Sequence, residues 1–414
     1  MRLLLKKIGL VGLLAATVAT VSAQKAKKAV FIIVDGISSD ALEKVSKPHL
    51  DSIAQVGGHA HAYVGGERKS YSQTPTISAV GYNSLLTGTW VNKHNVWGND
   101  IKAPNYHYWT IFRFFKEQFP QKKTAIFSTW LDNRTKLLGE NLSQTNYFKT
   151  DFHLDGLELD TLQYPHDKQS AYIRNIDEVV SKAAAASIRD QAPDLTWVYL
   201  EFTDDMGHKF GDSPQFYAAI ELMDKQVGRV WQAIQYRQQH YNEDWVIYIT
   251  TDHGRDAVKG MNHGGQSDRE RATWIVTNAK QLNAYFRNQV PAVVDIMPSI
   301  ASFLGVTIFR EQRFELDGVS LTGKVSGILP QARFQNGNIE LSWTALDPTG
   351  MASIWVATTN QFETGQPDKY QLLKKVPVSD QKASVDVSKL PSSFYKVVID
   401  MPHNSLNRWV ILEK

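Results

Sequence analysis

The chain contains no cysteine, which excludes disulfide bonds, thiol chemistry and cysteine-ligated metals. It also lacks an excess of charge of either sign. Three of the 45 basic residues lie in the first 23 positions, so the rest of the chain carries 42 basic and 42 acidic residues. Such a balance does not indicate a general nucleic-acid-binding surface.

Long hydrophobic runs are also scarce, and the one that stands out lies at the N-terminus. A basic start at residues 2–7 precedes an apolar run over 8–21, and residues 21–23 read Val-Ser-Ala, a signal-peptidase pattern. The run is shorter than the roughly 20 residues that a membrane span requires. We therefore predict a signal peptide at residues 1–23, cleaved near Ala23, and a secreted or periplasmic protein without a transmembrane anchor.

The length predicts two domains, because the roughly 390 remaining residues exceed the size of about 250 to 300 residues at which single cores stop growing. The sequence changes character after Pro330, where short alternating strands follow one another between turns that contain glycine or proline. We predict a catalytic domain at 24–328 and a fibronectin-type-III-like β-sandwich at 331–414. The expected strands of the sandwich are 338–343, 353–357, 383–387 and 395–399.

The larger segment is predicted to be an α/β domain. Near-continuous apolar runs, rather than alternating ones, are typical of strands that are buried on both faces. A helical pattern lies between two of them, with apolar residues spaced by three and four from Phe216 to Ile234. Strands that alternate with helices predict a largely parallel sheet flanked by helices. The expected strands are 29–34, 124–127, 197–202, 245–250 and 273–276.

Acidic residues and a histidine follow three of these strands. Asp35 follows the first, Asp204 the third, and Asp252 with His253 the fourth. Open α/β sheets bind ligands just beyond the carboxyl ends of their strands, so these side chains are expected to meet at one edge. Carboxylate and imidazole ligands without a thiolate suit zinc, or manganese, in a hydrolytic site.

The order of these fragments resembles the alkaline phosphatase superfamily, and most closely the nucleotide pyrophosphatase/phosphodiesterase family, over about residues 28–323. The candidate metal ligands that match its motifs are Asp35, Ser78, Asp204, His208, Asp252, His253 and His263. The resemblance implies two zinc ions and a small phosphorylated substrate. It assigns one ion to Asp35, Asp252 and His253, together with the serine oxygen. It assigns the other ion to Asp204, His208 and His263.

Ser78 is the candidate nucleophile. It opens a predicted helix, where free backbone N–H groups favour a phosphate, and it lies ten residues before Gly88, a spacing that members of the superfamily share. Ser72, Thr74 and Thr76 in the same loop are the alternatives. The phosphodiesterases usually have Thr-Phe-Pro-Asn where this chain has Ser-Ala-Val-Gly, which leaves the substrate class open. The resemblance implies a phosphoserine intermediate and net retention at phosphorus.

Four further residues are weighed for catalytic roles. Asn99 lies 21 positions after Ser78, where the phosphodiesterases have an Asn that donates to a phosphoryl oxygen; the alternative is a turn-forming Asn. Trp130 lies where relatives often have a leaving-group loop, or is a core aromatic. Arg134 or Lys136 could bind the dianion of a phosphate monoester, or be solvated charges.

Two other histidines and four other functions complete the expectations. His59 and His61 form either a surface metal site or one face of an edge strand. A phosphomonoesterase with the same metals is the nearest alternative function. A sulfatase is disfavoured because Ser78 lacks the Ser-x-Pro-x-Arg setting, and a cofactor-independent phosphoglycerate mutase because of the export signal. An inactive binding protein is disfavoured because all seven positions are filled. The leaving group and the oligomeric state stay open.

Overall fold

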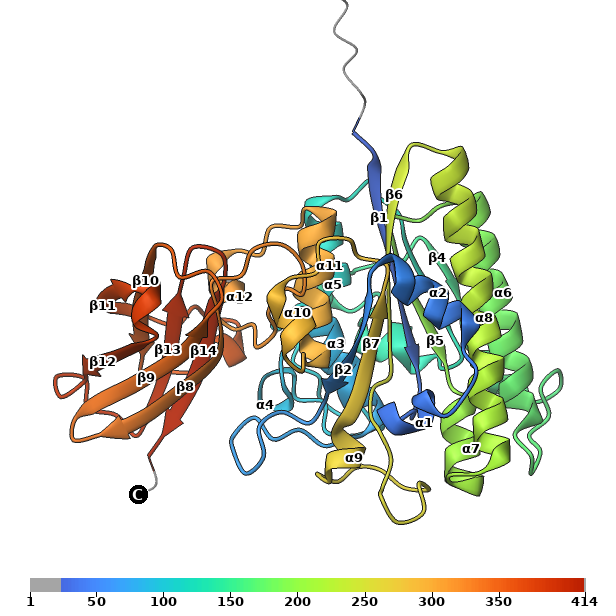
Figure 1. The fold of residues 1–414 in the computed structure, drawn as a ribbon, viewed down its shortest axis with the longest axis horizontal. Coiled ribbons are helices and arrows are strands. Elements are labelled where there is room, and N and C mark those ends of the chain that lie inside the picture. The colour runs from blue at the N-terminus through green and yellow to red at the C-terminus, as the bar shows by residue number, and fades with distance from the viewer. Residues whose placement is uncertain (1–23, 413–414) are drawn as a thin grey trace, which may run out of the picture.

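The computed structural model describes residues 24–412, so the predicted signal peptide lies outside it. An α/β layer structure makes up the larger part, and a β-sandwich lies beside it (Figure 1). No helix within residues 24–412 is both long enough and apolar enough to span a bilayer.

Across the described residues, the central sheet has seven strands in the order β2-β7-β6-β1-β5-β3-β4. They are β1 (Ala26–Val34), β2 (Gly58–Tyr63), β3 (Thr124–Ser128), β4 (Phe152–Leu154), β5 (Leu195–Leu200), β6 (Glu243–Thr250) and β7 (Ala272–Thr277). The pairs among β6, β1, β5, β3 and β4 are parallel, whereas β7 is antiparallel to β6 and to β2. The predicted, largely parallel sheet is confirmed.

One strand ends earlier than the apolar run predicts. The run was expected to continue to Phe202, but β5 ends at Leu200 and helix α7 (Phe202–Phe210) begins at that phenylalanine. The buried Asp177 carboxylate accepts hydrogen bonds from the backbone N–H groups of Glu201 and Phe202, at 3.1 and 2.9 Å. These bonds satisfy the free N–H groups at the start of α7 and turn the chain into the helix.

Helices cover both faces of the sheet (Figure 1). They are α1 (Ser39–Glu43), α2 (Pro48–Val56), α3 (Ser78–Thr87), α4 (Val91–His94), α5 (Ile111–Gln118), α6 (Ala171–Asp190), α7, α8 (Pro214–His240), α9 (Asp268–Arg271), α10 (Ala284–Asn288), α11 (Ile296–Leu304) and α12 (Arg310–Arg313). Successive side chains of β1 show the two layers. Val30, Ile32 and Val34 join the core with α6 and α8, whereas Phe31 and Ile33 join the core with α3, α5 and α11. The apolar stripe predicted from Phe216 to Ile234 is buried in α8.

The C-terminal part is the predicted sandwich of two antiparallel sheets. Its strands are β8 (Gly327–Gln335), β9 (Asn338–Ala345), β10 (Met351–Ala357), β11 (Gln371–Pro377), β12 (Lys382–Asp386), β13 (Phe394–Asp400) and β14 (Ser405–Ile411). Within the described residues they form the sheets β12-β9-β8 and β11-β10-β13-β14. The Tyr395 hydroxyl donates to the Leu390 carbonyl at 2.9 Å, which is the tyrosine corner that fixes one end of such sandwiches.

Buried polar contacts fix the sandwich to the α/β part. The ammonium group of Lys93, on α4, is fully buried and pairs with Asp317 at 2.6 Å. It also donates to the Glu315 carbonyl at 2.6 Å and to Asn407, on β14, at 2.9 Å. Because a buried charge is costly unless it is paired and hydrogen-bonded, this junction strongly favours one relative placement of the two parts.

A second contact joins the sandwich to the loop that leads to α3. The rings of Tyr71 and Trp409 stack with centroids 5.2 Å apart, and the Trp409 backbone N–H donates to the Tyr71 hydroxyl at 3.0 Å. Lys396, on β13, pairs with Glu315 and Asp368 at 2.6 and 2.8 Å. The sandwich therefore buttresses the loop that positions the start of α3.

Candidate functional site

The candidate ligands meet where the parallel strands end, at the lower edge of the sheet in Figure 1 near α7 and α9. Asp35 directly follows β1, Asp252 lies two residues beyond β6, and Asp204 lies in the first turn of α7. Helix α3 packs closely against this edge because Gly81 has no side chain: a Cβ there would lie 2.6 Å from the Asp252 carbonyl. This close approach brings Ser78 to the same place.

Asp35, Asp252 and His253 form the first group, with ligand atoms within 4.8 Å of one another. His253 Nε2 lies 3.3 Å from Asp35 Oδ1 and 3.3 Å from Asp252 Oδ2. Both oxygens are buried and have no hydrogen-bond partner among residues 24–412. The hydroxyls of Tyr82 and Tyr199 donate to the other oxygen of Asp35. Two buried carboxylate oxygens aimed at one imidazole nitrogen fit a divalent cation.

The charges in this group shift its pKa values. Burial, reinforced by the negative charge of Asp35, raises the pKa of Asp252 well above its usual range. Burial alone would lower the pKa of His253, but the carboxylates of Asp252 and Asp35 outweigh it and raise that pKa to about 9. Without a cation His253 therefore holds its second proton at neutral pH, and a metal would have to displace it on binding.

The second group lies against the first. Asp204, His253 and His263 have ligand atoms within 4.8 Å of one another, and the rings of His263 and His253 stack at 3.6 Å. His208 adjoins them, with Nε2 3.2 Å from Asp204 Oδ2 and 3.1 Å from His263 Nε2. His263 Nδ1 lies 2.8 Å from the Thr76 carbonyl, which fixes the tautomer that leaves Nε2 free to bind a metal. All six Asp and His candidates thus converge.

Ser78 lies within reach of the first group. It is buried, and its Oγ is 3.4 Å from His253 Nε2. The alternative hydroxyls point elsewhere: Thr74 donates to the Ser72 carbonyl at 2.9 Å, and Thr76 donates to another backbone carbonyl at 2.9 Å. This placement favours Ser78 over the other residues of its loop.

Asn99 also lies at the start of α3. Its Oδ1 accepts a hydrogen bond from the backbone N–H of Ala79 at 3.0 Å. That bond orients the exposed amide and leaves its Nδ2 hydrogens for a ligand next to Ser78. The geometry suits a donor to a phosphoryl oxygen.

Replacing Asn99 with alanine is expected to lower kcat by about 10²- to 10³-fold, the usual loss when one such donor is removed. Because Asn99 is exposed, the melting temperature should stay close to that of the wild type. Steady-state kinetics test this, with Lys102→Ala as a control on the same loop. Lys102 is exposed and pairs with Asp100 at 3.0 Å. A KM effect with unchanged kcat would show that Asn99 serves ground-state binding instead.

The contacts of Trp130 and Arg134 show which of their expected roles the structure allows. Trp130 is half-buried, and its ring lies edge-on to Tyr82 at 6.4 Å, so it stands beside the first group. Arg134 is held by Asp155 through bonds of 2.6 and 2.9 Å and also pairs with Glu140. Its guanidinium is therefore committed to carboxylates.

Lys136 pairs with Asp132 at 2.8 Å and is partly exposed. His59 and His61 lie on the edge strand β2, as the second reading of the sequence expects, and His61 Nε2 is 3.1 Å from Glu43. Neither histidine belongs to a group of three potential ligands within the described residues.

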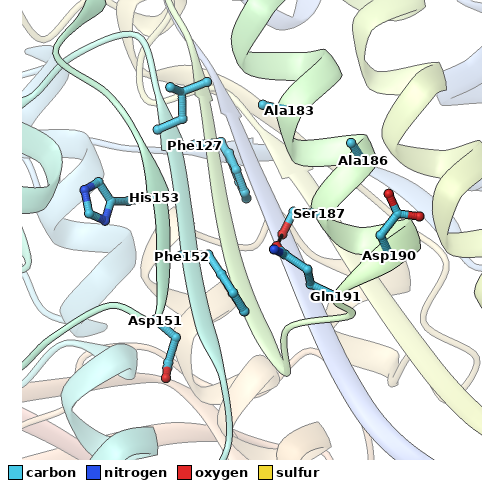
Figure 2. A pocket seen from close by; sticks show the side chains of 10 residues that line it. Phe127, Asp151, Phe152, His153, Ala183, Ala186, Ser187, Asp190 and Gln191 are labelled. Atoms are coloured by element: carbon cyan, nitrogen blue, oxygen red, sulfur yellow. Dashed lines mark hydrogen bonds between the residues drawn. The ribbon is translucent and has the colours of Figure 1, made fainter.

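A surface hollow that is unrelated to this site lies beside the edge strand β4. Figure 2 shows it between Phe152 and the end of α6, with Ser187 donating to Gln191 at 2.7 Å. It lies at the end of α6 that precedes β5, away from the carboxyl ends of the strands. None of the candidate ligands lines it.

Sequence reasoning missed three side chains that surround the ligands. Tyr82 and Tyr199 hold Asp35, and Arg255 holds Asp204. Only the motif Asp-His-Gly-Arg, which ends in Arg255, gave a local signal, because it places a cation two residues after a candidate ligand. The two tyrosines are distant in sequence from Asp35, and no motif around them indicates that they contact it.

Comparison with known proteins is consistent with this geometry. The chain matches the family model of type I phosphodiesterase / nucleotide pyrophosphatase over residues 29–298, and no curated protein matches it. Among solved structures, Ps i-CgsB is 15% identical over 84% of this chain and 86% of its own, with a TM-score of 0.51. A putative sulfatase from Bacteroides thetaiotaomicron is 11% identical over 88% and 86%, with a TM-score of 0.50. Human ectonucleotide pyrophosphatase/phosphodiesterase 5 is 15% identical over 68% and 96%, with a TM-score of 0.46.

Proposed function

Since the chain belongs to the type I phosphodiesterase / nucleotide pyrophosphatase family and is accordingly a phosphoric ester hydrolase, we propose that it cleaves phosphodiesters at a two-zinc site through a phosphoserine at Ser78. This proposal rests on two buried oxygens, one of Asp35 and one of Asp252, that have no hydrogen-bond partner among residues 24–412. Both face His253, whose Nε2 lies 3.4 Å from Ser78 Oγ. Asp35, Asp252 and His253 would hold one ion. Asp204, His208 and His263 would hold the other.

The side chains divide the reaction between them. The bound ions supply positive charge that lowers the pKa of the serine hydroxyl and of a water molecule. Ser78 Oγ attacks phosphorus and the alcohol leaves on the opposite side, while Asn99 Nδ2 donates to a non-bridging oxygen. Water then attacks the phosphoserine and the serine oxygen leaves with a proton. Two in-line displacements give net retention at phosphorus.

The surroundings favour a diester over a monoester. A monoester dianion calls for an additional positive group, yet Arg134 is paired with Asp155 and Glu140, and Lys136 with Asp132. Trp130 offers an aromatic surface that a leaving group can cover. A phosphomonoesterase is therefore the second candidate.

Rates with two chromogenic esters test the proposal. With zinc added, kcat/KM for bis-p-nitrophenyl phosphate is expected to exceed that for p-nitrophenyl phosphate by at least about tenfold, a difference of about 1.4 kcal/mol in transition-state binding. A chelator should abolish both rates, and zinc or manganese should each be tried for restoring them. A faster monoester would make the protein a phosphatase. Hydrolysis of p-nitrophenyl sulfate alone would contradict the phosphodiester proposal.

We further propose that the protein is exported. The basic and apolar segment at residues 1–23 supports this. N-terminal sequencing of the expressed protein should then find Gln24 first. A chain that retains residues 1–23 in the cytoplasm would contradict export without touching the catalytic proposal.

A further inference from the structure

Arg255 is fully buried beside the second group of ligands, two residues after His253. Its Nε donates to the Gly36 carbonyl at 2.8 Å, and its Nη2 donates to the Asp204 carbonyl at 2.8 Å. The same Nη2 also pairs with Asp204 Oδ1. The guanidinium thus ties together the loop after β1, the helix α7 and the loop after β6.

Two glycines make the space that this guanidinium occupies. A Cβ on Gly207, in the middle of α7, would lie 2.0 Å from Arg255 Cζ. A Cβ on Gly36, whose φ is +68°, would lie 2.6 Å from Arg255 Nη2. Because the two bonds to backbone carbonyls do not involve the Asp204 side chain, they hold Arg255 in place independently of what that carboxylate binds.

The pairing leaves Asp204 with one oxygen for a metal. Oδ1 pairs with Arg255 and lies 4.0 Å from His263 Nε2, whereas Oδ2 is not bonded to the arginine and lies 3.2 Å from His208 Nε2. A carboxylate with both oxygens free can bind an ion through one oxygen, through two, or between two ions. The arginine removes that choice, and the single-oxygen mode suits a four-coordinate zinc site.

We propose that Arg255 is a positioning residue that fixes Asp204 as a one-oxygen ligand. By doing so, Arg255 raises the zinc affinity of the half-site formed by Asp204, His208 and His263. The proposal rests on the proposed two-metal site and goes beyond it, because the donors of Arg255 are directed at the Gly36 carbonyl and at Asp204, so that it would act on the ion through Asp204. Groups that hydrogen-bond a metal ligand in this way typically change metal affinity by 10- to 100-fold.

Zinc titration of the metal-free protein tests the proposal without reference to activity. In the wild type two binding steps are expected, and Asp204→Asn identifies the step that belongs to its half-site. In Arg255→Gln that step should be about 10- to 100-fold weaker while the other stays unchanged. Arg255→Lys keeps the charge but not the forked geometry, so it should weaken the same step by about three- to tenfold and keeps the test open if the glutamine variant does not fold.

Arg237→Gln is the matched control. Arg237 is also buried and holds a carboxylate with two bonds, to Glu243 at 2.9 and 2.6 Å, but at the opposite end of β6. It should lower the melting temperature and leave both zinc steps as they are. Equal weakening of the two steps in the Arg255 variants, or no weakening, would overturn the inference. A wild-type protein that binds fewer than two zinc ions would instead refute the two-metal site itself.

Discussion

Replacing Ser78 with alanine is expected to give a folded, metal-loaded protein that hydrolyses its substrate at least about a thousandfold more slowly. Ser78 Oγ is 3.4 Å from His253 Nε2. The substitution removes one small hydroxyl at the start of α3, and the helix keeps its remaining bonds, so stability should change little. The loss should appear in kcat, because the nucleophile is needed for bond formation rather than for substrate binding.

Thr74→Val is the matched control for this loop. The Thr74 hydroxyl is buried, donates to the Ser72 carbonyl and accepts from the Val91 N–H, so valine of the same shape should lower stability but keep activity within a few-fold of the wild type. Mass spectrometry of an acid-quenched reaction should find phosphate on the peptide that contains residue 78 in the wild type and in Thr74→Val, but not in Ser78→Ala. Near-normal activity of Ser78→Ala would move the nucleophile to Thr74 or Thr76.

Replacing Asp252 with asparagine is expected to remove one metal ion per chain and to lower activity by at least about a thousandfold. Above about pH 9, where His253 is neutral, it should also stabilise the metal-free protein by about 1–3 kcal/mol. The reason is that Asp252 Oδ2 is buried without a hydrogen-bond partner among residues 24–412 and its charge faces Asp35, a cost that the amide reduces and that a charged His253 offsets only at lower pH. Zinc should raise the melting temperature of the wild type much more than that of the variant.

The pH dependence of the metal-free protein follows from the same charges. The pKa of His253 is raised to about 9 in the folded state, so its contribution to stability is complete below its unfolded pKa, near 6.5, and is lost as the pH rises through about 9. The raised pKa of Asp252 acts in the same direction. Wild-type protein kept free of metal should therefore lose stability between pH 6.5 and 9, and Asp252→Asn should lose less, because one of the carboxylates that raises the His253 pKa is gone.

Asp295→Asn separates this effect from that of any buried aspartate. The Asp295 carboxylate is also buried, but it accepts bonds from Ala292 N–H, Val319 N–H and the Tyr285 hydroxyl. Its replacement should cost stability and leave the metal content unchanged. Elemental analysis together with chemical unfolding decides the matter: an Asp252→Asn protein with a full complement of metal would contradict the ligand assignment.

The sequence predicts best those strands that are buried on both faces of the sheet. Strands buried on both faces give continuous apolar runs, which is why β1, β3 and β6 can be found without a structure. The strands β4, β8, β11 and β14 were missed. Charged and exposed residues interrupt their patterns, for example the two lysines at 374–375 in β11, so pairing partners rather than local composition define them.

The candidate site divides in the same way. That the candidate Asp and His residues would lie close together was predictable, because each follows a strand or sits in a short motif and parallel strands deliver such residues to one edge. The roles of Arg134 and Arg255 were not predictable. The first depends on Asp155 and Glu140 and the second on Asp204, and which carboxylate an arginine meets is decided by tertiary packing.

The buried junction around Lys93 has a consequence for how the molecule comes apart. One continuous apolar core contains Tyr82 from α3 and also Trp343 and Val397 from the sandwich. Separating the two parts would deprive the buried Lys93 ammonium group of Asn407, one of its partners, and would expose this shared core to water. Neither part is therefore expected to unfold alone. Calorimetry should record a single endotherm whose van't Hoff and calorimetric enthalpies agree. The sandwich is then an integral part of one cooperative folding unit and could not be exchanged between proteins as an independent domain.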